Sequence, residues 1–180
     1  MKTTKTATAE IPGDPGLVYD ILTDYDTYSD WMPHISRSKL LAREGDLAIA
    51  EFEVDAPKKG QFAVECIHTR NRQVMTRTIS GDVPLTEVAW DLTPGSPGTT
   101  SVKITMRAAG WKTLLPAYRK YSDATKCLKA LHKQAATFGD SLAVEDSSGE
   151  KVFELAETEQ GLVCWHRGKK YTLTPAAEGK

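Results

Sequence analysis

Apolar and polar residues alternate along most of the first 110 residues of the chain. Seven stretches follow a period of two, and turn signals such as Glu44-Gly45-Asp46 and Arg70-Asn71 separate them. These stretches predict strands over residues 4–11, 35–43, 47–55, 61–69, 73–80, 85–93 and 99–109. Short loops join the last six, so the pattern predicts an antiparallel meander completed by the first strand. Alternation leaves one face of this sheet apolar, and that face needs a cover.

Helical spacing occurs between the first two strands and again after the last one. Asp14 and Pro15 mark the start of a short helix that runs through Leu22, and a second short helix is predicted over residues 26–31. A longer apolar stripe recurs at steps of three and four over residues 114–138. We expect this long helix to cover the apolar face of the sheet.

The last forty residues have a different character. Polar, flexible composition predicts a linker over residues 140–149, after a main domain over residues 1–139. Three short alternating runs, residues 152–156, 162–166 and 170–173, predict a small three-stranded extension within residues 150–180. Because it is too short to hold a core alone, it is expected to dock on the main domain or on a partner chain. A homodimer through this extension is one hypothesis.

Composition narrows the classes of partner. Lys and Arg number 23 against 24 Asp and Glu, so no global field favours nucleic acid. Cys66, Cys127 and Cys164 are widely spaced in apolar surroundings, which predicts free buried thiols in a reducing compartment. No apolar run is long enough to span a membrane, and the first residues do not form a signal peptide. We therefore expect a cytoplasmic protein without stable membrane insertion.

Two motifs resemble a known family. They are Leu22-Thr23-Asp24-Tyr25-Asp26-Thr27-Tyr28-Ser29-Asp30-Trp31-Met32-Pro33, and Ile79-Ser80-Gly81-Asp82-Val83-Pro84-Leu85 followed by Trp90 and Gly98-Thr99-Thr100. With the order of elements, they resemble the START and Bet v 1 (SRPBCC) superfamily, in its polyketide cyclase/dehydrase and coenzyme-Q-binding branch. The resemblance covers residues 4–138. It implies an α+β helix-grip fold, in which a seven-stranded curved antiparallel sheet wraps around the long C-terminal helix.

That fold implies a cavity where the long helix stands off the sheet, near the start of the helix. Polar, aromatic and inward-facing residues around it are the ligand-binding candidates. They are Trp31, Met32 and His34 at the entrance, Phe52, Val64, Cys66, His68, Met75, Arg77, Trp90 and Met106 on the strands, and Trp111, Leu115 and Tyr118 near the helix start. The alternative is that these side chains simply fill a core.

Arg77 is the most informative of these candidates. It shares parity with Met75 and Ile79, so it is predicted to point inward, where an unpaired guanidinium would cost several kcal/mol. It must therefore meet an acidic group or a ligand carbonyl, or the assignment of faces is wrong. His34 and His68 could act as general bases or could be structural.

Three functions fit these observations. The leading hypothesis is binding or transport of a hydrophobic small molecule, such as a lipid, a quinone or a polyketide-like compound. The second is a cyclase/dehydrase in which Arg77, His34 or Tyr118 handles protons, and the third is a protein-interaction module that uses the C-terminal extension. Motifs for nucleotide or metal chemistry do not occur, so no cofactor and no metal are expected.

Overall fold

The computed structural model describes residues 2–55, 59–81, 83–110, 123–138, 142–145, 151–158, 161–166 and 169–173. The chain divides into two compact units, Met1–Gln134 and Ala135–Lys180. The first unit contains the predicted sheet, the short helices and most of the described part of the C-terminal helix.

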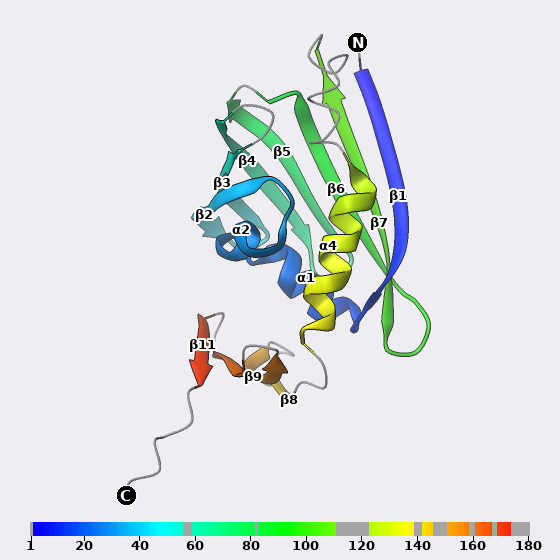
Figure 1. The fold of residues 1–180 in the computed structure, drawn as a ribbon, viewed down its shortest axis with the longest axis vertical. Coiled ribbons are helices and arrows are strands. Elements are labelled where there is room, and N and C mark those ends of the chain that lie inside the picture. The colour runs from blue at the N-terminus through cyan, green and yellow to red at the C-terminus, as the bar shows by residue number, and fades with distance from the viewer. Residues whose placement is uncertain are drawn as a thin grey trace, which may run out of the picture. The chain divides into compact units, whose positions relative to one another are not determined.

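A curved antiparallel sheet of seven strands forms the body of the first unit (Figure 1). Its strands are β1 (Lys2–Pro12), β2 (Ile35–Glu44), β3 (Leu47–Val54), β4 (Gly60–Thr69), β5 (Gln73–Gly81), β6 (Leu85–Pro94) and β7 (Thr99–Ala109). They follow the order β1-β7-β6-β5-β4-β3-β2 in the sheet. Adjacent strands are therefore consecutive in the sequence, except that β1 pairs with β7. The seven predicted strands and the antiparallel meander are confirmed.

The two faces of the sheet differ as alternation requires. On β4, Phe62, Val64 and Cys66 are buried, whereas the residues between them lie partly exposed on the opposite face. Inward residues of neighbouring strands are in register, for example Thr76 with Val88 on β5 and β6. The inner face therefore carries the apolar side chains, and the outer face carries most of the charges.

Of the short helices between β1 and β2, the first contacts β5, β6 and β7, and the following two contact the edge strand β2. Asp14 caps α1 (Pro15–Thr23), since its Oδ1 accepts the Leu17 amide at 2.8 Å. The predicted second helix is a 3-10 turn, η1 (Tyr25–Thr27), followed by one α-helical turn, α2 (Tyr28–Trp31). Asp26 Oδ1 accepts the Leu40 amide of the edge strand β2 at 2.8 Å, which ties this insert to the sheet.

Helix α4 (Ala124–Ala136) crosses the concave side of the sheet (Figure 1). Asp123 precedes it as a cap: the Lys126 amide donates to Asp123 Oδ1 at 3.1 Å, and the Cys127 amide donates to its carbonyl. An unbroken helix over residues 114–138 is therefore a wrong prediction, because the chain is not helical at Asp123. The predicted helix start, residues 114–122, lies outside the described residues.

The second unit contains a four-stranded antiparallel sheet with the order β11-β10-β9-β8. Strands β9 (Lys151–Thr158), β10 (Gly161–His166) and β11 (Lys169–Leu173) lie where three strands were predicted. Strand β8 (Leu142–Glu145) falls within the segment predicted to be a linker, so that part of the prediction is wrong. The docking of this unit on the main domain or on a partner chain stays a prediction.

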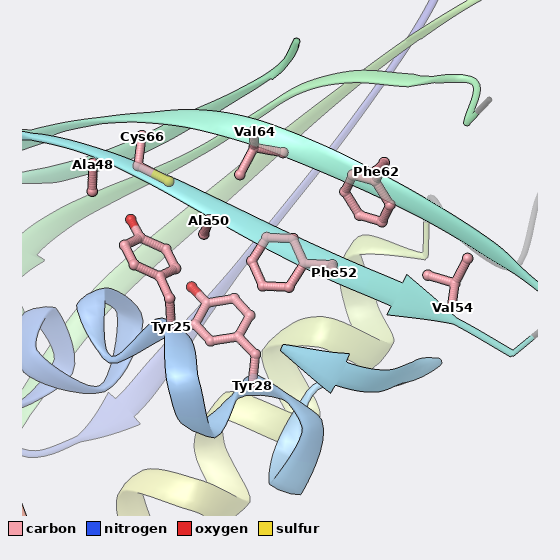
Figure 2. Close-up of a cluster of buried hydrophobic side chains, with 9 residues drawn as sticks. All are labelled: Tyr25, Tyr28, Ala48, Ala50, Phe52, Val54, Phe62, Val64 and Cys66. Carbon is pink, nitrogen blue, oxygen red and sulfur yellow. The ribbon is translucent and has the colours of Figure 1, made fainter. Parts of the chain in front are cut away.

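A buried group of three polar side chains, Tyr25, Cys66 and His68, lies inside the core formed by the short helices and strands β3 and β4. Tyr25 Oη lies 2.7 Å from His68 Nε2, and Figure 2 shows the same hydroxyl directed toward Cys66. All three side chains are at most 4% exposed. Burial raises the pKa of the Cys66 thiol to about 11 and raises the pKa of Tyr25, so both groups are neutral near pH 7.

His68 belongs to this group but has one unpaired atom. Its Nδ1 is buried without a hydrogen-bond partner among the described residues. Burial, and next the nearby Arg43, lower the pKa of His68 below its ordinary value of 6.5. His68 therefore stays neutral in the folded protein under conditions that would protonate it in the unfolded chain.

Gly81, the last residue of β5, is expected to be one of the least replaceable glycines. It has φ +102°, and a Cβ there would collide with the Gln61 carbonyl oxygen and lie 2.6 Å from Phe62 Cα. Gly98 is a matched control, because it has φ +78° but open space where a Cβ would stand. Gly98→Ala should lower the free energy of unfolding by about 1–2 kcal/mol, and Gly81→Ala by more than about 3 kcal/mol. Chemical denaturation measures both, and equal losses would contradict the collision.

The buried His68 should make stability depend on pH in one direction. Because its folded pKa lies below the unfolded value of 6.5, the unfolded chain takes up a proton first as the pH falls. Its stabilising contribution is therefore complete above about pH 6.5 and is lost from there down toward the folded pKa. Denaturation midpoints between pH 7.5 and 5 should fall less steeply in His68→Gln than in the unsubstituted protein. Parallel slopes would show that His68 does not titrate in this way.

Candidate ligand-binding cavity

A cavity of about 90 Å³ lies between the inner face of the sheet, the loop after α2 and helix α4. Its described lining comes from all these elements. The lining residues are Tyr28, Met32, Pro33, Ile35, Phe52, Val54, Phe62, Val64, Thr76, Thr78, Val83, Leu85, Glu87, Val88, Trp90, Met106 and Cys127. Most of these side chains are aliphatic or aromatic, so the cavity offers an apolar environment.

Aromatic rings that pack at tilted angles form one wall of the cavity. The centroid of the Phe52 ring lies 5.4 Å from that of Tyr28 and 5.5 Å from that of Phe62. Figure 2 shows Tyr28 rising from the short helices toward Phe52 on strand β3. The Tyr28 hydroxyl donates to the Leu22 carbonyl at 2.7 Å, so its polar end is satisfied within the protein. This wall is therefore well packed.

Polar side chains in the lining gather on strands β5 and β6. Thr76 and Thr78 face the cavity from β5, and Glu87 borders it from β6, next to a shift in register between Leu85 and Glu87. The Glu87 carboxylate is held by two arginines, with Arg107 Nη1 at 2.8 Å from its Oε1 and Arg77 Nε at 3.5 Å from its Oε2. No lysine, arginine or histidine is among the described lining residues.

Several sequence-predicted residues lie in this lining. The structure places Met32, Phe52, Val64, Trp90 and Met106 there. Trp111, Leu115 and Tyr118 lie outside the described residues. That any of these side chains contacts a ligand stays a prediction.

Arg77 and Met75 do not face the cavity, and the predicted parity of β5 is wrong. Val74 is fully buried and Thr76 and Thr78 line the cavity, so Arg77 lies on the outer face with its side chain 51% exposed. Apolar residues occur on both faces of this strand. The register with β4 and β6 decides which face of β5 points inward, because it sets Thr76 beside Cys66 and Val88. Arg77 does meet an acidic group, namely Glu87.

The remaining candidates lie near the cavity but outside its described lining. Trp31 packs on Tyr28, with ring centroids 5.0 Å apart, and its Nε1 is buried without a partner in the described part of the chain. His34 stands between two lining residues in a left-handed conformation, φ 68°, with Nδ1 3.9 Å from Asp55 Oδ1. Cys66 and His68 belong to the buried group with Tyr25. These four are therefore not brought together into one site.

The sequence analysis missed several lining residues. Val54 and Phe62 share parity with Phe52 and Val64, so the alternation that identified the latter pair could also have identified them. Thr76 and Thr78 were signalled by their parity with Val74. Pro33 and Val83 precede strands, and Ile35 and Leu85 begin β2 and β6 next to shifts in register, so alternation does not assign their faces. Their place in the lining depends on tertiary structure.

Other kinds of site have little support in the described part of the chain. There, no three His, Cys, Asp or Glu side chains gather as metal ligands. No described helix is both long and apolar enough to cross a bilayer. The prediction of free, buried thiols at Cys66, Cys127 and Cys164 is confirmed. The arrangement is suited to holding an apolar molecule, since described charged side chains are excluded from the lining apart from the paired Glu87.

Comparison with known proteins agrees with this architecture. A family model described as polyketide cyclase / dehydrase and lipid transport matches residues 11–121. A START superfamily protein from Mycobacterium smegmatis is similar in structure, with a TM-score of 0.64 at 22% identity over 74% of this chain and 97% of that one. No curated protein matches the chain in sequence.

Two further solved structures have the same fold. The Zhui aromatase/cyclase from a Streptomyces species has a TM-score of 0.64 at 14% identity, over 83% of this chain and 99% of that one. The TTHA0849 protein of Thermus thermophilus has a TM-score of 0.65 at 19% identity, over 77% of this chain and 100% of that one. The chain has the helix-grip START fold and belongs to the family described as polyketide cyclase / dehydrase and lipid transport.

Proposed function

We propose that this protein binds or transports a hydrophobic small molecule, such as a lipid, a quinone or a polyketide-like compound, in the cavity between sheet and helix. The observation that carries this proposal is the lining itself, in which aliphatic and aromatic side chains from five strands converge with Cys127 of α4. Each 100 Å² of apolar ligand surface removed from water contributes about 2.5 kcal/mol. The family description, which includes lipid transport, supports the same class of ligand.

A carrier fits the geometry better than a catalyst. Arg77 lies on the outer face, and His34 stands beside Asp55 rather than in the described lining. General acid–base catalysis needs groups within hydrogen-bond reach of the reacting atoms. The described lining supplies Glu87, which is paired with two arginines, and three hydroxyl groups.

A cyclase or dehydrase is the second candidate. It is favoured by the family description and by the similarity to the Zhui aromatase/cyclase. In that case His34 and Tyr118 are the remaining proton-handling candidates from the sequence. Incubation with linear polyketide thioesters, followed by mass spectrometry, tests it: ring-closed or dehydrated products that disappear in His34→Ala or Tyr118→Phe would favour the enzyme over the carrier.

We place the protein in the cytoplasm, in keeping with its free cysteines. Interaction of the C-terminal extension with a partner, including a second copy of the chain, stays a separate hypothesis. Sedimentation of the protein with and without residues 140–180 would test the homodimer.

Protein purified from its own host should carry an apolar molecule. Native mass spectrometry should show a non-covalent adduct that organic extraction removes, because the apolar lining releases such a ligand slowly into water. Adding the extracted molecule back should raise the melting temperature. Purified protein without an adduct, combined with no thermal shift from any apolar compound tested, would refute the proposal.

Filling the cavity should abolish binding without unfolding the protein. Val88 lines the cavity between Thr76 and Met106, so Val88→Phe should weaken binding of the neutral fluorophore N-phenyl-1-naphthylamine at least tenfold. Ala89→Phe is the matched control, since Ala89 lies on the outer face beside Met75. Equal affinities for the two variants, with cooperative unfolding retained in both, would place the ligand elsewhere.

A further inference from the structure

We propose that the Thr76 hydroxyl determines ligand specificity, and that the ligand is an uncharged apolar molecule with one oxygen that hydrogen bonds to it. This inference rests on the proposed function, since it concerns the same cavity. It adds the polar requirement of the ligand, which neither the fold nor the family description gives.

Three described side chains bring hydroxyl groups to the lining, and two of them are already used. Tyr28 donates to the Leu22 carbonyl at 2.7 Å, and Thr78 donates to the Leu85 carbonyl at 2.6 Å. The Thr76 hydroxyl has no hydrogen bond within the described part of the chain. A threonine hydroxyl both donates and accepts, so it can serve a ligand alcohol or a ligand carbonyl.

The position of Thr76 makes its hydroxyl the expected hydrogen-bond partner of the ligand oxygen. It lies in an inward-facing row that crosses four strands, with Cys66 on one side and Val88 and then Met106 on the other. The Cys66 thiol belongs to the buried group with Tyr25, and the other two neighbours are apolar. A ligand oxygen at Thr76 would therefore be surrounded by hydrocarbon, where a hydrogen bond discriminates strongly between ligands with and without a partner for it.

The charges around the cavity argue for a neutral ligand. Glu87 is the single charged residue in the described lining, and Arg77 and Arg107 hold its carboxylate from the outer face. The two arginines are thus occupied, with side chains 51% and 58% exposed. A ligand carboxylate would be buried in this apolar lining without a described cation to pair with it, which is unfavourable.

Three naphthalene derivatives of similar size test the proposal. 2-Naphthol carries a hydroxyl, 2-methylnaphthalene replaces it with a methyl group, and 2-naphthoate replaces it with a carboxylate. Competition against N-phenyl-1-naphthylamine gives the dissociation constants for the unsubstituted protein, Thr76→Val, Thr76→Ser and the matched control Thr105→Val. The control makes the same substitution on the outer face of β7, where Thr105 lies beside Ala89 and outside the described lining.

The unsubstituted protein should bind 2-naphthol most tightly and 2-naphthoate most weakly. Thr76→Val should reduce the preference for 2-naphthol over 2-methylnaphthalene about fivefold, Thr76→Ser should restore it, and Thr105→Val should leave it within twofold. An unchanged preference in Thr76→Val, or tightest binding of 2-naphthoate, would overturn this inference and leave the proposed function intact. Failure of all three ligands and the fluorophore to bind would overturn the proposed function as well.

Discussion

The packing of Tyr25 and Tyr28 onto strands β3 and β4 sets the boundary between the closely packed core of the first unit and its cavity. Both rings come from the short insert between β1 and β2, and both are almost fully buried against Phe52. Buried phenols are stable there because each hydroxyl has a partner, His68 Nε2 for Tyr25 and the Leu22 carbonyl for Tyr28. The cavity begins on the other side of Tyr28 and Phe52.

This arrangement separates two sets of polar side chains in the interior of the first unit. Behind the aromatic wall, Tyr25, Cys66 and His68 lie together and are kept neutral by burial. In front of it, the threonines of β5 face the cavity. The histidine and the cysteine are thus buried beside a tyrosine and outside the described lining, whereas Thr76 faces the cavity.

Charge is distributed across the sheet by the same register that builds the core. Glu65, Arg77, Glu87 and Arg107 are successive cross-strand partners on the outer face of strands β4 to β7, with alternating sign. Pairs of this kind contribute little stability when exposed, about 0–1 kcal/mol each. Their main consequence is that a one-residue slip would bring charges into the cavity, so they favour the observed register.

The sequence predicted the strands closely because alternation and turn residues are local signals. Each of the seven strands begins and ends within about two residues of its predicted position, as does α1 with its Asp14 cap. The prediction of the inward face of β5 failed because Val74 on one face and Met75 and Ile79 on the other are all apolar. Local periodicity cannot choose between two faces that are each partly apolar. The helix prediction failed at Asp123 because a stripe of apolar residues can continue across a cap.

The amino-acid sequence by itself determined the order of elements, the antiparallel meander and the apolar class of the core, since these follow from periods of two and of about 3.6 residues. Tertiary structure alone decided which side of β5 faces inward, which histidine is buried with a tyrosine, and which hydroxyl of the lining has no partner among the described residues. The physical reason is that such outcomes depend on pairing between strands and on packing of the insert against them. Those contacts join residues far apart in the chain, where no local pattern records them.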